Sequence, residues 1–137
     1  MRLSKTSVYA IRVLVYLAQQ SELPCSTNTL HQALDIPYKY LGRLMKMLTD
    51  AGFLVSTRGK AGGYRIKGDA SQISLHQIID AVEGVQDFER CLLGLPNCSD
   101  TNPCVLHDRW GEQRETIKKM FQSVMLSDLA SKTHLRH

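Results

Sequence analysis

The chain has 137 residues and a net charge of +4, and 43% of its residues are hydrophobic. That is long enough and apolar enough for one compact domain with a core, which argues against a disordered chain. No apolar run approaches the ~18 residues typical of a membrane span, so no membrane partner is expected. The N-terminal segment lacks the pattern of a secretory signal, and the expected location is therefore the cytoplasm.

The charge is unevenly distributed along the chain. Residues 1–70 contain ten Lys and Arg against four Asp and Glu, whereas residues 71–137 contain seven against nine. A basic front half is typical of a surface that meets a polyanion such as double-stranded DNA. A solvated basic surface without a partner gives the same count, so charge alone leaves both interpretations open.

Three helices are predicted in the front half. Apolar residues recur at steps of three and four over residues 4–20, which indicates an amphipathic helix. Ser26 can cap a second helix over residues 27–34. Pro37 favours the start of a third helix, and Gly52 favours its end. The residues expected to face inward are Val8, Ile11, Leu14, Val15 and Ala18, then Leu30, Ala33 and Leu34, then Leu41, Leu44, Met45 and Leu48.

The segment after the third helix predicts a β-hairpin. "FLVST" and "YRI" have strand composition, and "RGKAGG" between them is a glycine-rich turn. A basic helix followed by a basic hairpin is typical of a winged helix-turn-helix, in which the helix enters the major groove and the hairpin the minor groove. A small helical domain with a solvated hairpin shares these elements without binding DNA. The expected DNA contacts are Lys39, Tyr40, Gly42, Arg43 and Lys46 in the helix, and Arg58, Gly59, Lys60 and Arg65 in the hairpin.

The back half predicts further helices. Ser74 and Gln77 have the spacing of a capping box, and Gly84 ends that helix. Residues 105–124 form a long helical pattern with one apolar stripe among charges, and such a stripe needs a partner. The partner is either a second copy or the chain's own front half; we favour a homodimer, which also matches two DNA half-sites. The expected dimer residues are Trp110, Ile117, Phe121 and Val124.

Three of the four cysteines lie in one loop, with the spacing Cys91-x6-Cys98-x5-Cys104-x2-His107. A reducing cytoplasm and an odd number of thiols argue against a disulfide framework. Structural zinc sites usually contain closely spaced cysteine pairs, which this loop lacks. Soft thiolates on a flexible loop can also hold an iron–sulfur cluster. The spacing therefore indicates a metal or cluster site without separating the two.

Several stretches resemble the Rrf-type family of bacterial winged helix-turn-helix regulators, which includes IscR and NsrR. They are "YAIRVLVYLA", "RGKAGGYRI" and "NPCVLHDRW". The resemblance implies a homodimeric DNA-binding transcription regulator, most often a repressor, and not an enzyme. It implies that Cys91, Cys98, Cys104 and His107 hold an iron–sulfur cluster that controls DNA affinity in response to iron, redox state or nitric oxide.

The same resemblance favours a [2Fe-2S] over a [4Fe-4S] cluster. NsrR-like members take an acidic ligand from the first helix of the partner protomer, and the matching stretch "SKTSVYA" contains no acid. The first gap of six residues is one longer than in the IscR pattern. The IscR branch also has a glutamate where this chain has Gly42, which implies a different DNA specificity. The alternative is a regulator without a cluster that responds to a small molecule or a partner protein.

The expected fold is mainly α-helical with one small β-hairpin. A winged helix-turn-helix domain covers residues 1–84, and a cysteine-rich loop covers residues 85–108. A dimerisation helix and a final short helix cover residues 105–130, followed by a flexible tail over residues 131–137. Cys25 is expected to be a bystander, and His31 and His76 are expected to be surface residues, with His31 a minor candidate ligand. His134 and His137 are expected to be disordered residues rather than ligands.

Overall fold

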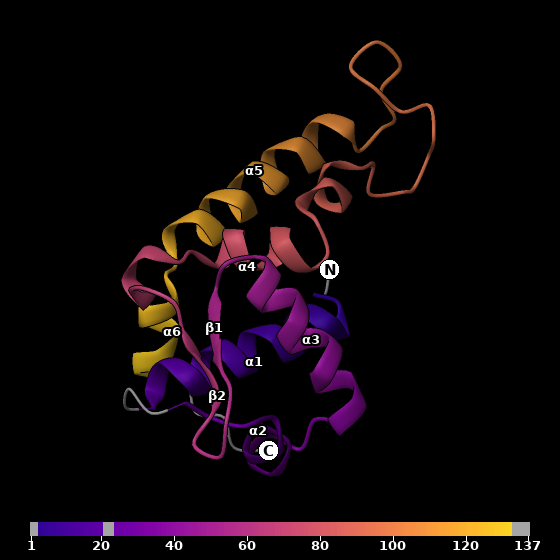
Figure 1. Ribbon diagram of the computed structural model, residues 1–137. Coiled ribbons are helices and arrows are strands. Elements are labelled where there is room, and N and C mark those ends of the chain that lie inside the picture. The colour runs from indigo at the N-terminus through magenta and orange to yellow at the C-terminus, as the bar shows by residue number, and fades with distance from the viewer. Residues whose placement is uncertain (1–2, 21–23, 133–137) are drawn as a thin grey trace.

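The computed structural model describes residues 3–20 and 24–132, and it describes Asp87 and Phe88 by their backbone alone. The tail residues 133–137, with His134 and His137, lie outside this part of the chain. The described residues form helices and one antiparallel hairpin, which confirms the expected mainly α-helical class (Figure 1). The elements are α1 (Lys5–Gln19), α2 (Thr27–Leu34), α3 (Tyr38–Asp50), β1 (Leu54–Thr57), β2 (Gly63–Ile66), η1 (Ala70–Gln72), α4 (Leu75–Val82), η2 (Val85–Glu89), α5 (His107–Ser123) and α6 (Leu126–Lys132).

The turn between α2 and α3 is held by specific contacts. The Oγ of Ser26 accepts a hydrogen bond from the Thr29 amide at 3.1 Å and caps α2, as predicted. Asp35 then reverses the chain in the left-handed conformation, with φ of 54°. His31 contributes to the same turn, because its Nδ1 lies 2.6 Å from the carbonyl oxygen of Ile36. His31 is therefore a structural residue of the helix-turn-helix, which its sequence context did not indicate.

The core forms around α1, which contacts α2, α3, β2, α4 and α6. All four inward residues predicted for α3 are buried. The prediction for α1 was partly wrong, because Val8 is 41% exposed whereas Ala10 and Val13 are fully buried. Because other elements pack on several sides of α1, its buried face is wider than a single apolar stripe. It is also rotated around the helix relative to the stripe that the sequence pattern predicts. In α2, Leu30 and Leu34 are buried, but Ala33 is exposed.

The hairpin has a third backbone partner that the sequence did not reveal. The strands β1 and β2 pair in antiparallel register from Leu54 opposite Ile66 to Thr57 opposite Gly63. Cys25 adds a bridge to Tyr64, with amide-to-carbonyl distances of 2.9 and 2.8 Å. The hairpin is thereby fixed to the segment before α2. Cys25 has a structural position, and burial raises the pKa of its thiol.

The last helix returns to the front half of the molecule. The capping box at α4 forms as predicted, because the Ser74 side chain accepts from the Gln77 amide and the Gln77 side chain accepts from the Ser74 amide. After α5 the chain passes the N-terminal end of α4, where the Leu126 amide donates to the Ile73 carbonyl at 2.7 Å. Leu126 is fully buried, and α6 packs against α1. The α5 helix, by contrast, extends away from the body, and the cysteine loop lies at its far end (Figure 1).

Candidate DNA-binding surface and metal centre

One face of α3 is basic and open to solvent. Its opposite face supplies four core residues, so Lys39, Arg43 and Lys46 are left exposed. Lys46 also forms an exposed ion pair with Asp50 at 3.0 Å. At Gly42, an added Cβ would meet nothing within 4 Å, so the middle of this face is flat. A basic helix with a flat central position can approach a DNA groove closely.

Tyr40 is placed differently from the other predicted DNA contacts. Its ring packs edge-on against Tyr9, with ring centroids 5.3 Å apart, and its hydroxyl bonds to that of Thr6. Tyr40 therefore fastens the start of α3 to α1. A contact of Tyr40 with DNA stays a prediction.

The hairpin presents a second basic group. Arg58, Gly59 and Lys60 lie in the exposed connection between the strands, and Arg65 is exposed on β2. Gly59 has φ of 106°, and its carbonyl accepts from the Gly62 amide at 3.0 Å to close the turn. Since β1 packs on α3, the hairpin and the basic helix form one continuous structural unit.

The loop of residues 90–106 brings the sulfur atoms of its three cysteines together. The sulfur atoms of Cys91, Cys98 and Cys104 all lie within 4.8 Å of one another, and those of Cys91 and Cys104 are 3.7 Å apart. The Cys104 amide donates to the Cys98 sulfur at 3.4 Å. All three thiols are half-buried. Three soft sulfur donors converge here, which suits a thiophilic metal ion or an iron–sulfur cluster.

The pKa values of Cys91 and Cys98 are shifted in opposite directions. The amide of Leu95 hydrogen-bonds to the Cys91 sulfur and is the main reason that the pKa of Cys91 is lowered to about 7. At Cys98 the Cys104 amide also favours the thiolate, but desolvation and the two neighbouring thiols outweigh it and raise the pKa of Cys98. Of these two thiols, Cys91 therefore supplies a thiolate more readily than Cys98.

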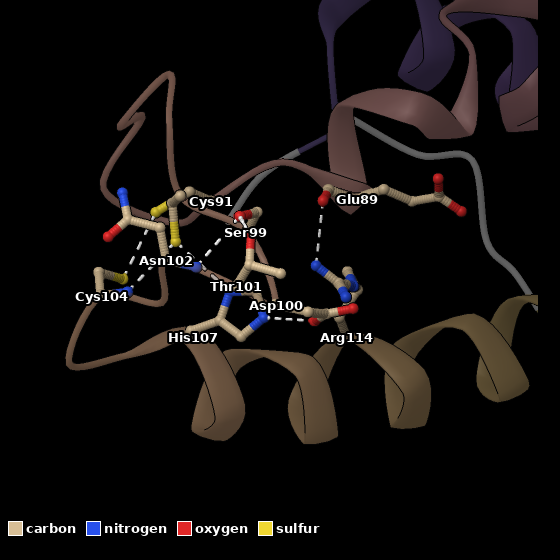
Figure 2. Close-up of polar contacts among 10 residues, drawn as sticks. Glu89, Cys91, Ser99, Asp100, Thr101, Asn102, Cys104, His107 and Arg114 are labelled. Carbon is tan, nitrogen blue, oxygen red and sulfur yellow. Dashed lines mark hydrogen bonds and ion pairs between the residues drawn. The ribbon is translucent and has the colours of Figure 1, made fainter.

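His107 joins the group through one nitrogen, at the first residue of α5. Its Nδ1 lies 3.4 Å from the Cys98 sulfur, and its Nε2 lies 2.8 Å from the Asp100 carboxylate (Figure 2). The sequence spacing predicted His107 as part of the site. It did not indicate Asp100, because a lone acid in a polar loop carries no recognisable motif.

The two ends of the loop are joined by hydrogen bonds from α5. The indole Nε1 of Trp110 donates to the Arg90 carbonyl at 3.0 Å, and Arg114 donates to the Glu89 carbonyl at 3.0 Å. The loop is thereby closed at its base by α5 itself. The loop exposes the apolar side chains Leu92, Leu93, Leu95 and Val105.

The residues predicted to form a dimer also contact their own chain. Phe121 is buried, and together with Trp110 and Ile117 it lines a cavity of about 270 Å³ between α5, η2 and α4. Val124 is half-buried where α5 ends, and its carbonyl accepts from the Leu75 amide. A role of these four residues between protomers stays a prediction. Among the described residues, no helix is long and apolar enough to cross a bilayer.

An exposed basic helix beside a basic, glycine-rich hairpin defines a winged-helix DNA-binding protein. The family model described as "Rrf2: Iron-dependent Transcriptional regulator" matches residues 3–132. The chain therefore belongs to the Rrf2 family of transcriptional regulators, and the resemblance found in the sequence is confirmed.

Three similar proteins illustrate this membership. Protein rrf2 of Nitratidesulfovibrio vulgaris is 31% identical over 130 residues, which cover 94% of this chain and 87% of that protein. The transcriptional regulator IscR of Yersinia pseudotuberculosis is 30% identical over 132 residues, with 96% and 80% covered. The solved structure of CymR, the global cysteine regulator of B. subtilis, superposes with a TM-score of 0.81 at 26% identity and covers 98% of this chain and 99% of its own. IscR and CymR are named regulators, in agreement with the expectation that the chain is not an enzyme.

Proposed function

We propose that this protein is a homodimeric, cytoplasmic transcriptional repressor whose DNA affinity is set by an iron–sulfur cluster. The proposed ligands are Cys91, Cys98, Cys104 and His107. The observation that carries the proposal is the convergence of three thiols within 4.8 Å, with the Nδ1 of His107 3.4 Å from one of them. This set of three soft sulfurs and one imidazole fits iron–sulfur ligation.

A [2Fe-2S] cluster is the proposed type. It needs four protein ligands, and the loop with the start of α5 supplies three sulfurs and one nitrogen. The first turn of α1 contains no acid, so its described residues offer no carboxylate ligand of the NsrR kind. When bound, such a cluster supplies a one-electron redox centre whose thiolate ligands are open to oxidation.

The position of the loop explains how its order can affect DNA binding. The loop connects η2 to α5, and α5 contacts α4, which itself contacts α1 and α3. A well-ordered loop fixes the start of α5, and the contact with α4 transmits that position toward the basic helix. A cluster bound at the loop changes DNA affinity only if it binds the DNA-binding arrangement of the protein more tightly or more weakly than the other arrangement. This follows from thermodynamic linkage.

Exposed apolar residues support the proposed homodimer. Met120 on α5 is 51% exposed, and Val8 on α1 is 41% exposed. Neither is covered within the described part of the chain. A twofold dimer buries such surface on both copies and presents two basic helices to two half-sites.

The direct test is anaerobic purification of the full chain. We expect a coloured protein with visible absorption, bound iron and acid-labile sulfide, and a DNA affinity that changes when the cluster is removed. Cys98→Ala should abolish iron binding, whereas Cys25→Ala should retain it, because Cys25 lies outside the loop. Colourless wild-type protein without iron or sulfide contradicts the proposal, and so does equal DNA affinity with and without the cluster.

A second candidate function is a cluster-free regulator that binds a small molecule. The cavity of about 270 Å³ between α4 and α5 favours it. The Nε2 of His76 lines this cavity and, among the described residues, is buried without a hydrogen-bond partner. A colourless wild-type protein whose melting temperature and DNA affinity both change with an added metabolite supports this candidate over the first.

A further inference from the structure

We propose that Asp100 is a positioning residue of the metal centre. Its carboxylate accepts a hydrogen bond from Nε2–H of His107 and thereby directs Nδ1 of the imidazole toward the thiols. The inference rests on the proposed function, since it requires His107 to be a ligand. It adds a residue and a ligating atom that the cysteine and histidine spacing did not identify.

The two ring nitrogens of His107 face different groups. Nε2 lies 2.8 Å from Oδ1 of Asp100, and Nδ1 lies 3.4 Å from the sulfur of Cys98. A neutral imidazole has one N–H donor and one lone pair, and an ionised carboxylate can only accept. In the neutral imidazole, a hydrogen bond to Asp100 therefore places the proton on Nε2 and leaves the lone pair on Nδ1. That lone pair is the proposed ligand, because Nδ1 is the ring nitrogen that lies beside the Cys98 sulfur. The contact of the other ring nitrogen with Asp100 is drawn as a dashed line in Figure 2.

The backbone around Asp100 explains why its carboxylate has a defined position. Ser99 and Asn102 exchange two backbone hydrogen bonds, at 3.2 and 3.1 Å, and close a tight turn around residue 100. The Asn102 side chain donates to the Asn97 carbonyl at 3.2 Å and fastens the turn to the preceding segment. The loop between the second and third cysteines thus holds an acid against the histidine that follows them.

The exposure of the pair separates a positioning role from a stabilising one. The Asp100 side chain is 99% exposed and that of His107 is 22% exposed. An exposed pair of this kind contributes little to folding stability, because water screens it. Outer-sphere partners of a histidine ligand nevertheless change metal affinity by roughly 10- to 100-fold, because they fix the ring and increase its basicity. Loss of Asp100 should therefore change the metal centre and leave the fold intact.

The chain provides a matched control in Asp108. This residue is also an exposed acid beside His107, in the first turn of α5. Asp108→Asn removes the same charge from the same neighbourhood without removing the carboxylate that contacts Nε2. The comparison separates the hydrogen bond from general electrostatics.

The experiment compares anaerobically reconstituted wild type with Asp100→Ala, Asp100→Glu and Asp108→Asn. The measurements are the cluster affinity in competition with an iron chelator, the midpoint reduction potential and the nitrogen hyperfine couplings of the reduced cluster. Asp100→Ala should weaken cluster binding by roughly 10- to 100-fold. It should also raise the potential, because a less basic imidazole stabilises the oxidised cluster less. Asp100→Glu should restore most of both properties, and Asp108→Asn should match the wild type in affinity.

The outcomes distinguish this inference from the proposed function. A wild type that takes up no iron and sulfide overturns both. A wild type that binds the cluster with Nδ1 coordination, together with the expected loss in Asp100→Ala, supports both. A cluster that binds equally well in Asp100→Ala and wild type, or that is coordinated through Nε2 of His107, overturns the role of Asp100 alone. Far-ultraviolet circular dichroism checks that each variant retains its helices.

Discussion

Gly63 lies where β2 comes closest to the segment before α2. A Cβ added there would lie 2.4 Å from the Cys25 carbonyl oxygen, and the residue has φ of 150°. The two backbone hydrogen bonds between Cys25 and Tyr64 require this approach. A glycine in the wing thus serves a contact inside the molecule, in addition to any contact with DNA.

We predict that Gly63→Ala destabilises the protein by about 1–3 kcal/mol, the range for a residue held in an unfavourable backbone conformation. The matched control is Gly42→Ala, because an added Cβ there meets nothing within 4 Å. Removing a glycine from a helix interior should stabilise by roughly 0.5–1 kcal/mol. Chemical denaturation of both variants measures the difference, and equal midpoints would show that the contact with Cys25 is not tight.

At the scale of the element, the hairpin is a fixed support for exposed basic side chains. Its strands are fixed on one side by α3 and on the other by the bridge to Cys25. Arg58 and Lys60 extend from the connection between the strands, where they are exposed. Because the hairpin backbone is already ordered, placing one of its cations in a narrow minor groove loses little further conformational entropy.

Arg58→Ala should therefore weaken DNA binding by about 1–3 kcal/mol, the range for a specific arginine contact. The measurement is a titration of DNA that the wild-type protein has selected from a random pool. Lys119→Ala on α5 is the control, because it removes one exposed positive charge far from the hairpin in sequence. Unchanged affinity in Arg58→Ala, or an equal loss in both variants, would refute the assignment of the wing.

At the scale of the whole molecule, α5 connects the cysteine loop to the winged-helix core. Its start carries His107, and its end packs beside the cap of α4 and continues into α6 on α1. Its exposed face is mostly charged, with Met120 the large apolar side chain left open on the described helix. A partner helix crossing α5 would bury Met120 on both copies.

We predict that Met120→Glu shifts the protein from dimer to monomer, because two buried like charges would meet at a twofold interface. Sedimentation velocity over a range of concentrations measures the change. Met47→Glu is the matched control, since Met47 is 36% exposed on α3, outside the proposed interface. A Met120→Glu variant that remains as dimeric as Met47→Glu argues against a dimer through this face.

Local pattern predicted most of the elements. Ser26 and Ser74 cap the expected helices, and the hairpin strands lie where composition placed them. The signals are short-range: a cap, a periodicity and a glycine turn each depend on neighbours within a few residues. The prediction that Val8 faces inward was wrong because the buried face of α1 depends on long-range contacts with the helices that surround it.

The sequence by itself determined the class of this protein: a basic helix, a glycine-rich basic wing and a loop of three cysteines and a histidine. Each of these is a matter of residue type and spacing along the chain. Only the tertiary structure decided which atoms meet: the Cys25 backbone with Tyr64, α6 with α1, and Asp100 with Nε2 of His107. These contacts join residues without a shared motif, and chain geometry in three dimensions brings them together.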